Sequence, residues 1–312
     1  MKIFEEIQTF LNQCEQNNKR PLIAILGPTA SGKTSLSIEI AKKVDGEVIS
    51  ADSRQVYKYM DIGTAKVTRP EMQGVPHHML DVIDPTEEFT LSDFKRQALK
   101  AISEVHTRKK VPILCGGTGL YFSAIIQNYQ IPRIPPQFDV RQKLAHYYEE
   151  HGAEELHKLL QEKDPEAAKR IHPNNVRYVI RALEIVMTGS QKKSDLKGEP
   201  LFEVFKIGID WPRDVLYERI NNRVHEQLNS GLLNEVKTLL MKGYHEKLPS
   251  MSSLGYPELI EYIKGDVSLE QATENIQKNT RNYCKRQFTW FRREQDVVWV
   301  SGQEIEQYLK AN

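Results

Sequence analysis

The sequence predicts an α/β protein with a P-loop NTPase-like, doubly wound and mostly parallel sheet and an inserted all-helical subdomain. Three observations support this fold class. Short apolar runs alternate with helical patterns over the first 130 residues, which is typical of a parallel sheet with helices on both faces. A glycine-rich loop pattern follows the first apolar run, and a proline-rich stretch at 131–138 precedes a long region with no strand pattern.

The first half of the chain supplies most of the predicted sheet. Residues 21–26 form an apolar run that ends at Gly27, and apolar residues recur at helical spacing after Lys33. Thr90 has the side chain to cap a following helix, and Gly116 to Gly119 open the chain after a buried run. These patterns predict strands at 21–26, 47–50, 78–83 and 111–115, and helices after Lys33 and over 91–108.

The second half returns to the sheet after the insertion. The helical region that follows the proline-rich stretch ends at a break near 188–190. Beyond it we expect a strand at 202–209, helices at 213–229, 231–242, 255–264 and 268–293, and a last strand at 297–300. The prediction is therefore a core domain of residues 20–130 plus 200–302, with the helical insertion at 131–199.

Composition excludes several classes of protein. The 312 residues carry 43 Lys+Arg against 42 Asp+Glu, a net charge of +1, so the chain is neither collagenous, disordered nor strongly basic. Its three cysteines form no CxxC or Cys/His cluster, so we expect neither a zinc site nor a disulfide framework. No apolar run approaches the roughly 20 residues that span a bilayer, and the first residues include acids. We expect a cytoplasmic protein without a membrane anchor.

Residues 27–34 (GPTASGKT) match the phosphate-loop pattern GxxxxGK[ST] and lie between a predicted strand and a predicted helix. In this pattern backbone N–H groups and a helix N-terminus face one anion. Lys33 adds a cation, and the Thr34 hydroxyl is placed for Mg²⁺. The expected pyrophosphate-binding residues here are Gly27, Thr29, Ala30, Ser31, Gly32, Lys33 and Thr34. The motif indicates a pyrophosphate or polyphosphate and does not specify ATP.

Asp52 follows the second predicted strand. Ligands of open parallel sheets gather beyond the carboxyl ends of the strands, so Asp52 is expected to face the same cleft as the phosphate loop. An acid there could hold Mg²⁺, cap the next helix or act as a general base. The residues alone leave these three roles open.

A basic and aromatic segment lies between Gln277 and Arg293. It holds six basic residues and no acid, interleaved with Tyr283, Phe288 and Trp290. Such a mixture suits phosphate contacts and base stacking. A helix with a basic solvent face and an aromatic core face would have the same composition, and both interpretations stay open at this point.

Six segments together resemble the tRNA dimethylallyltransferase family, the bacterial tRNA isopentenyltransferases. They occur in order over about residues 20 to 300, and five of them are not shared by other phosphate-loop proteins. The segments are GPTASGKT (27–34), ADSRQVYKYMDIGTAK (51–66), GGTGLYFSA (116–124), RIHPNNVRYVIRALEIVMTG (170–189), SLGYPEL (253–259) and KNTRNYCKRQFTWFR (278–292). Val67 and Pro257 depart from the family pattern.

The resemblance implies transfer of a dimethylallyl group from dimethylallyl pyrophosphate to N6 of adenosine-37 in tRNA. Asp52 then corresponds to the catalytic base, while Lys33 and Thr34 stabilise the pyrophosphate leaving group, with Mg²⁺ as the cofactor. At least one of Arg219 and Arg223 is expected to reach the pyrophosphate. Both are also compatible with solvent-exposed positions on the helix surface.

The resemblance also implies a set of tRNA contacts, made in part by the insertion at 131–199. Position 37 lies in a stacked loop, so its base must flip into a pocket. Arg181 could instead pair with Glu184 inside one helix. The implied contacts are Asp52, Ser53, Arg54, Gln55, Thr118, Arg141, Arg177, Arg181, Arg281, Lys285 and Arg286. We expect the chain to be a monomer.

A phosphate loop also occurs in three other classes of protein that the sequence can be compared with. A small-molecule or nucleoside kinase also places an acid after its second strand and would need ATP, but no arginine-rich lid follows Asp52. A prenyltransferase acting on free AMP or ADP would not need so large an insertion. A GTPase-like switch would need an NKxD motif, which the sequence lacks.

Overall fold

The computed structural model describes residues 1–131, 137–187 and 197–311. Most of the proline-rich stretch and the expected break at 188–190 therefore lie outside the described residues. The chain folds into two compact units, one formed by Met1–Ile126 with Pro200–Asn312 and the other by Gln127–Glu199. None of the described helices is long and apolar enough to cross a membrane.

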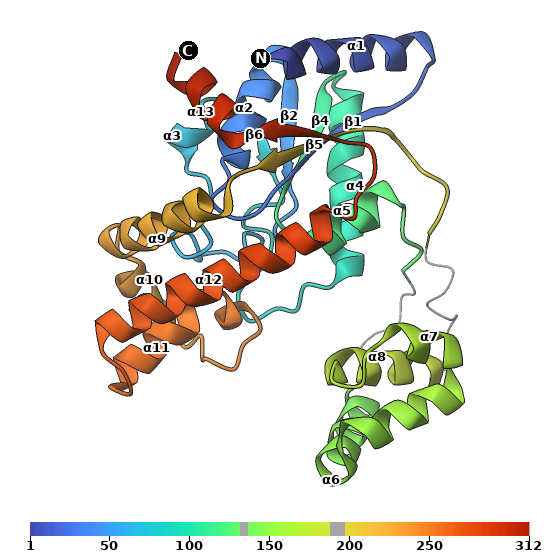
Figure 1. Ribbon diagram of the computed structural model, residues 1–312, viewed down its shortest axis with the longest axis vertical. Helices are drawn as coiled ribbons and strands as arrows, with labels where there is room; N and C mark the ends of the chain where they lie inside the picture. The colour runs from blue at the N-terminus through green and yellow to red at the C-terminus, as the bar shows by residue number, and fades with distance from the viewer. Residues whose placement is uncertain (132–136, 188–196, 312) are drawn as a thin grey trace. The chain divides into compact units, whose positions relative to one another are not determined.

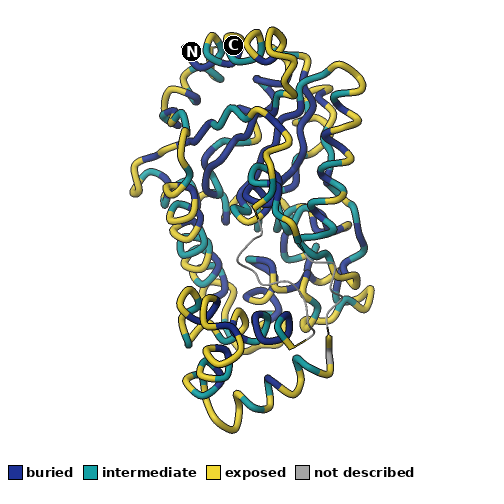
Figure 2. Tube along the Cα trace, turned by 90° about the vertical axis from the view of Figure 1, so that its right-hand side faces the viewer, coloured by how far each residue is buried: buried dark blue, intermediate teal, exposed yellow. Residues whose placement is uncertain are grey.

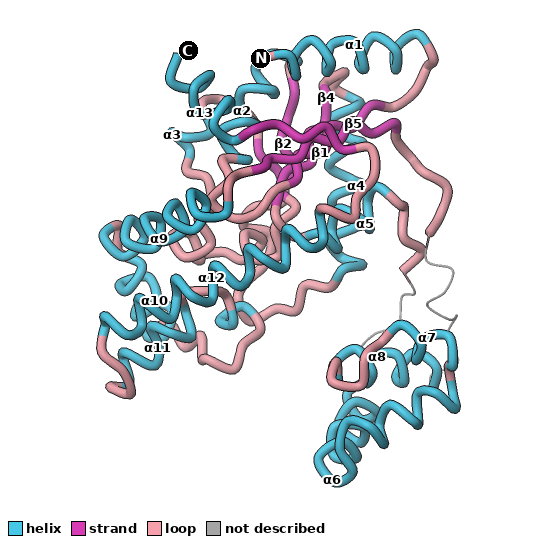
Figure 3. Tube along the Cα trace, in the orientation of Figure 1, coloured by secondary structure: helices cyan, strands magenta, loops and turns pink. Residues whose placement is uncertain are grey.

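The larger unit contains one six-stranded sheet with the strand order β3-β2-β4-β1-β5-β6 (Figure 3). All the pairings between its strands are parallel. The strands are β1 (Pro21–Leu26), β2 (Gly46–Ser50), β3 (His77–His78), β4 (Val111–Gly116), β5 (Glu203–Asp210) and β6 (Val297–Ser301). The predicted parallel, doubly wound sheet is confirmed, and all of its strands end at one edge.

Helices cover both faces of the sheet (Figure 1). Alternate residues of β1 point to opposite faces: Ile23 and Ile25 pack with α1 (Lys2–Gln16), α2 (Lys33–Val44) and α13 (Gly302–Ala311). Leu22 and Leu26 pack with α4 (Leu91–Thr107) and α5 (Gly119–Ile126) on the other face. The central strands β1, β2 and β4 are buried on both sides over almost all of their length (Figure 2), which explains why they read as continuous apolar runs.

A third apolar cluster joins the later helices to the loop after β2. Val56 and Met60 from that loop are fully buried against Tyr256. The helices that contribute are α9 (Arg213–Asn229), α10 (Leu232–Met241), the short 3-10 helix Ser250–Ser252, α11 (Tyr256–Lys264) and α12 (Leu269–Phe291). This packing fixes the loop that carries Asp52.

The smaller unit is helical throughout its described part, with α6 (Phe138–Lys163), α7 (Pro165–Arg170) and α8 (Val176–Met187). Its own core includes Leu156, Leu160, Val179 and Leu183, all fully buried. Gly152, with φ 82°, interrupts α6.

Two differences separate the predicted and observed elements of the larger unit. The strand predicted at 78–83 is wrong beyond His78, because Met79 and Asp81 adopt left-handed φ values of 66° and 54° that end an extended strand. The sequence patterns also gave no prediction for α1, the short α3 (Arg69–Met72), α5 and α13. By contrast, the cap at Thr90 is confirmed, since its side chain accepts a hydrogen bond from Asp93 N.

Candidate active site

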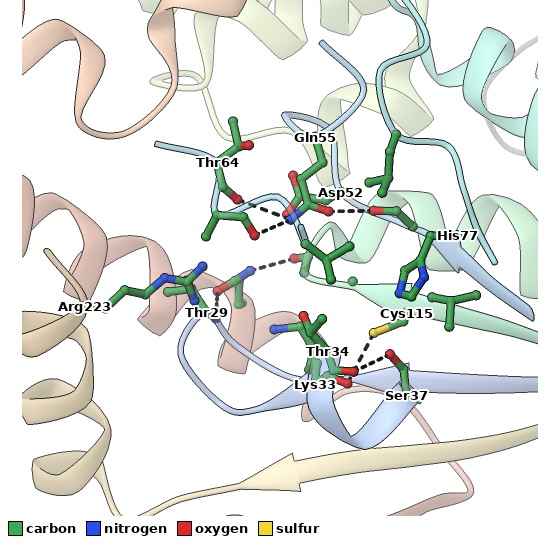
Figure 4. Close-up of a pocket in the computed structure, with 18 of the residues that line it drawn as sticks. Thr29, Lys33, Thr34, Ser37, Asp52, Gln55, Thr64, His77, Cys115 and Arg223 are labelled. Carbon is green, nitrogen blue, oxygen red and sulfur yellow. Dashed lines mark hydrogen bonds between the residues drawn. The ribbon is translucent and has the colours of Figure 1, made fainter. Parts of the chain in front are cut away.

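A cavity of about 100 Å³ lies at the edge of the sheet where β1, β2 and β4 end (Figure 4). The phosphate loop, the segment after β2, the glycines after β4, and helices α9 and α12 all contribute to it. Its polar lining comprises Thr29, Lys33, Thr34, Ser37, Ser50, Asp52, Gln55, Thr64, His77, Arg223, Tyr283 and Gln287. The expected convergence of Asp52 with the phosphate loop is therefore observed.

The phosphate loop has the backbone of an anion-binding turn. Ala30 and Gly32 adopt left-handed φ values of 61° and 90°, and α2 begins at the next residue, so the helix N-terminus faces the cavity. Trp211 Nε1 donates to Ser31 O at 3.0 Å and braces the loop from outside. Ser31 Oγ is buried and has no hydrogen-bond partner among the described residues. A bound anion would supply the missing acceptor.

Two cations line the cavity without a carboxylate salt bridge in the described part of the chain. Burial, together with the Arg223 charge, lowers the pKa of the Lys33 ammonium to about 8. Burial likewise lowers the pKa of Arg223, while the Asp52 charge acts in the opposite direction. Two partly desolvated cations beside a phosphate loop favour a polyanionic ligand.

Arg219 is placed differently from Arg223, although both lie on α9. Its Nε donates to Ala30 O at 3.0 Å, its other end pairs with Glu306 of α13, and its guanidinium stacks on Trp211. Arg219 thus supports the phosphate loop from behind and does not line the cavity. Of the two arginines, at least one of which was expected to reach the pyrophosphate, only Arg223 lines the cavity.

The loop after β2 holds Asp52 in a fixed turn. Asp52 Oδ1 accepts a hydrogen bond from Arg54 N at 2.8 Å, which closes a turn rather than capping a helix, because residues 53–56 form a turn and the next helix begins only at Arg69. Thr118 Oγ1 accepts from Ser53 N at 3.1 Å, and Thr118 N donates to Ala51 O at 3.1 Å. A Cβ on Gly116 would lie 2.3 Å from Ala51 O, so only glycine lets β4 approach the Asp52 turn this closely.

Arg54 and Gln55, both expected to contact tRNA, make bonds within the protein. Arg54 donates to Pro249 O at 2.7 Å and to Ser252 Oγ at 3.1 Å. The Gln55 amide donates to Thr64 O and Ala65 O at 3.2 and 3.1 Å. These bonds brace the wall of the cavity.

Gln287 and Tyr283 of α12 are site residues that the sequence patterns did not single out as ligands or supports. Gln287 Oε1 accepts from Thr29 N at 2.8 Å, and its Nε2 donates to Gly117 O at 2.9 Å, so one buried amide joins the phosphate loop to the glycines after β4. Burial, with the Asp52 charge, raises the pKa of Tyr283 to about 12. The spacing of residues along α12 cannot predict the hydrogen bond between Gln287 and Thr29, because the two residues lie 258 positions apart in the sequence.

The arginines expected to bind tRNA in the helical unit divide into two groups. Arg141 and Arg181 both bond to Glu184 Oε2, at 3.0 and 2.7 Å, and Glu184 is fully buried. Burial opposes the charged form of Glu184, but hydrogen bonds from Arg181, the Gln137 amide and Arg141 outweigh it, so its pKa lies below the ordinary value. The alternative pairing of Arg181 with Glu184 is observed, whereas Arg177 is exposed.

The basic segment on α12 is a helix with a solvent face and a core face, the second of the two interpretations left open by the sequence. Phe291 is buried in the core, while Trp290 is 39% exposed. Lys285 and Arg286 are exposed, and Arg281 donates to Asn221 Oδ1 at 2.6 Å. The helix therefore has an apolar inner face and a cationic outer face.

The donor set of the cavity fits a Mg²⁺ ion. The Thr34 hydroxyl and the Asp52 carboxylate line the same space, and Mg²⁺ prefers such oxygen ligands, usually with only one or two from protein. The described residues contain no cluster of three or more His, Cys, Asp or Glu that could hold a metal ion alone. The remaining ligands would come from phosphate oxygens and water.

Comparison with known proteins identifies a single family. Residues 55–294 match the model of the IPP transferase family. The chain is 46% identical over 303 residues to the tRNA dimethylallyltransferase of Bacillus cytotoxicus, covering 95% of this chain and 96% of that one. It is 44% identical over 294 residues to that of Caldanaerobacter subterraneus, covering 92% and 93%.

Solved structures give the same result. The full-length tRNA isopentenylpyrophosphate transferase of Bacillus halodurans aligns with a TM-score of 0.69 at 43% identity, covering 94% of this chain and 96% of that chain. A eukaryotic dimethylallyltransferase acting on tRNA aligns with a TM-score of 0.76 at 28% identity, covering 93% and 75%.

Proposed function

The chain belongs to the IPP transferase family and is a transferase, and we propose that it transfers a dimethylallyl group from dimethylallyl pyrophosphate to N6 of adenosine-37 in tRNA. The observation that carries this proposal is the sharing of one small cavity by Asp52, the phosphate loop, Lys33 and Arg223. A base therefore lies beside the groups that would hold a pyrophosphate.

The phosphate loop and its cations act on the leaving group. As the allylic C1–O bond breaks, negative charge grows on the pyrophosphate. The loop amides, Lys33 and Arg223 offset that charge from fixed positions, which lowers the barrier more than mobile water could. The buried Ser31 hydroxyl has the free hydrogen to donate to a phosphate oxygen. A Mg²⁺ ion held by Thr34, with its other ligands from phosphate oxygens and water, would supply further charge stabilisation when bound.

Asp52 acts on the acceptor. The adenine amino group is a weak nucleophile because its lone pair is delocalised into the ring. N6 bonds to C1 as the C1–O bond breaks, and the carboxylate accepts the N6 proton. The turn that holds Asp52 Oδ1 against Arg54 N fixes the direction of that transfer. The base reaches the cavity by flipping out of its stack.

The tRNA contacts proposed for this enzyme fall into two classes. Ser53 and Thr118, hydrogen-bonded to each other beside Asp52, would contact the target nucleotide. The exposed cations Arg177, Lys285 and Arg286 would contact phosphates. The other expected contacts bond within the protein, and we propose that they act mainly by shaping the surface that binds tRNA. They are Arg54, Gln55, Arg141, Arg181 and Arg281. We propose a monomer that acts on tRNA in the cytoplasm.

Single-turnover transfer from radiolabelled dimethylallyl pyrophosphate to an unmodified anticodon stem-loop tests this function. We expect label in the RNA at adenosine-37, and a loss of at least about 100-fold in the rate for Asp52→Asn, which keeps the shape of the side chain. The affinity of Asp52→Asn for dimethylallyl pyrophosphate, measured by titration calorimetry, serves as the folding control.

Two other outcomes would each indicate a different enzyme activity. Label in free AMP but not in RNA would move the acceptor to nucleotides. Consumption of ATP without prenyl transfer would establish the kinase in place of the transferase.

A further inference from the structure

His77 on β3 supplies a buried hydrogen-bond acceptor that the mechanism above does not use. The side chain lines the catalytic cavity. Its Nδ1 lies 2.9 Å from Val75 O, and because a carbonyl only accepts, Nδ1 must carry the hydrogen. The Nε2 atom then carries a lone pair, and it is buried with no hydrogen-bond partner among the described residues.

The imidazole is neutral under ordinary conditions. Burial lowers the pKa of His77, and the neighbouring His78 lowers it further. His78 itself is bonded to Glu47 at 2.7 Å, so of two adjacent histidines one is partnered and the other is left with a free acceptor. A buried acceptor without a donor costs free energy, so its presence in a cavity calls for a ligand.

The surroundings of His77 indicate which part of a substrate would lie there. Val48, its neighbour in the β2–β3 register, also lines the cavity, together with Val67 and Leu80. In Figure 4, His77 lies at the opposite side of the drawn side chains from Arg223. A donor whose pyrophosphate lies against Arg223 and the phosphate loop would extend its apolar prenyl tail toward His77.

The other polar groups at this end are already satisfied. Ser37 Oγ donates to Thr34 O at 2.7 Å, and Ser50 Oγ bonds to Gln55 Oε1 at 3.0 Å. A plain dimethylallyl tail offers no hydrogen for His77 Nε2. A tail with a hydroxyl group on a terminal carbon does.

We propose that His77 lets this enzyme use a C5 allylic diphosphate that carries a hydroxyl group on a terminal methyl carbon, in addition to dimethylallyl pyrophosphate. This rests on the proposed function and names a second donor for the same site. The bonds are unchanged: C1–O breaks, N6–C1 forms, Asp52 takes the N6 proton and pyrophosphate leaves. The hydroxyl group is carried over intact and donates its hydrogen to His77 Nε2, so no oxidant is required.

A comparison of two donors tests the proposal. The stem-loop RNA is incubated with dimethylallyl pyrophosphate or with (E)-4-hydroxy-3-methylbut-2-enyl diphosphate, and the ratio of the two kcat/KM values is measured for each enzyme. The ratio is independent of the fraction of folded protein. The variants are His77→Phe, which keeps a ring without an acceptor, and His77→Gln, which keeps an acceptor oxygen, with His78→Gln as the control outside the cavity.

We expect the wild-type enzyme to use both donors and His77→Phe to shift the ratio toward dimethylallyl pyrophosphate by about tenfold or more. His77→Gln should retain part of the use of the hydroxylated donor, and His78→Gln should match the wild-type ratio. The proposal is overturned if the wild type transfers only the dimethylallyl group, or if His77→Phe leaves the ratio unchanged, since water would then satisfy Nε2. Transfer from neither donor would overturn the proposed function instead.

Discussion

Two arginines one helical turn apart have different tasks. Arg219 and Arg223 lie on the same face of α9, yet Arg219 bonds to Ala30 O and Glu306 while Arg223 lines the cavity. Next to Arg223, Lys33 holds a charge that burial disfavours. The site therefore keeps two poorly solvated cations close together, and a pyrophosphate relieves that cost when it binds.

The pH dependence of donor binding follows from Lys33. Its pKa of about 8 in the folded protein lies below the ordinary value of 10.5, so the free enzyme loses this charge as the pH rises through about 8. We expect the affinity for dimethylallyl pyrophosphate to fall by about tenfold between pH 7 and pH 9, measured by calorimetry. Lys33→Arg, which stays charged, should show a flat profile, and a flat profile for the wild type would contradict the assignment.

The same shift has a consequence for stability. A lysine with a lowered folded-state pKa takes up fewer protons in the native than in the unfolded state between about pH 8 and 10.5. Charged Lys33 therefore costs stability below pH 8, and that cost disappears as the pH rises toward 10.5. The charge on Lys33 that is expected to bind the pyrophosphate therefore lowers the free energy of unfolding of the protein.

At the scale of elements, α12 joins parts of the site that are distant in sequence. Its inner face places Gln287 between the phosphate loop and the glycines after β4. Its outer face presents Lys285 and Arg286 to solvent. One helix thus connects the pyrophosphate end of the site to a surface suited to RNA phosphates.

Gln287→Ala should damage both donor binding and stability. Loss of the two bonds leaves Thr29 N and Gly117 O without partners in a buried setting, at a cost of about 1–3 kcal/mol. We expect a lower Tm and a KM for dimethylallyl pyrophosphate raised by about tenfold. Gln271→Ala, an exposed position on the same helix, is the control. An unchanged KM would show that the phosphate loop holds its shape without α12.

At the scale of the whole molecule, charge sets how RNA is attracted. The net charge is +1, so no overall positive field draws RNA to the protein. Affinity must come from local cations, and the exposed Arg177, Lys285 and Arg286 are candidates on the two units.

Salt dependence measures the contribution of each of these cations. For Arg286→Gln we expect the slope of log affinity for the stem-loop against log salt concentration to decrease by about 0.7 in magnitude, the value for one single-strand phosphate contact. Lys310→Gln, at an exposed position on α13, should leave the slope unchanged. Fluorescence anisotropy over a range of KCl concentrations gives the slopes. Identical slopes for Arg286→Gln and wild type would remove Arg286 from the RNA surface.

Local patterns were sufficient for much of the fold. Strands buried on both faces read as apolar runs, and the helices from α9 to α12 begin and end within a few residues of their predicted bounds. The strand expected at 78–83 failed because left-handed turns at Met79 and Asp81 depend on packing against the loop after β2. Helix α5 was missed because it is apolar on almost every side, so no amphipathic period marks it.

The sequence by itself determined the phosphate loop and the position of Asp52 at the end of another strand, because both depend on local spacing. Their meeting at one edge of the sheet follows from the common direction of parallel strands. The tertiary structure alone decided which arginine reaches the cavity, that Arg54 bonds within the protein, and that Gln287 and His77 belong to the site. Those outcomes depend on partners brought together across the fold. A spacing pattern specifies the face on which a side chain lies, whereas its bonds depend on what packs against that face.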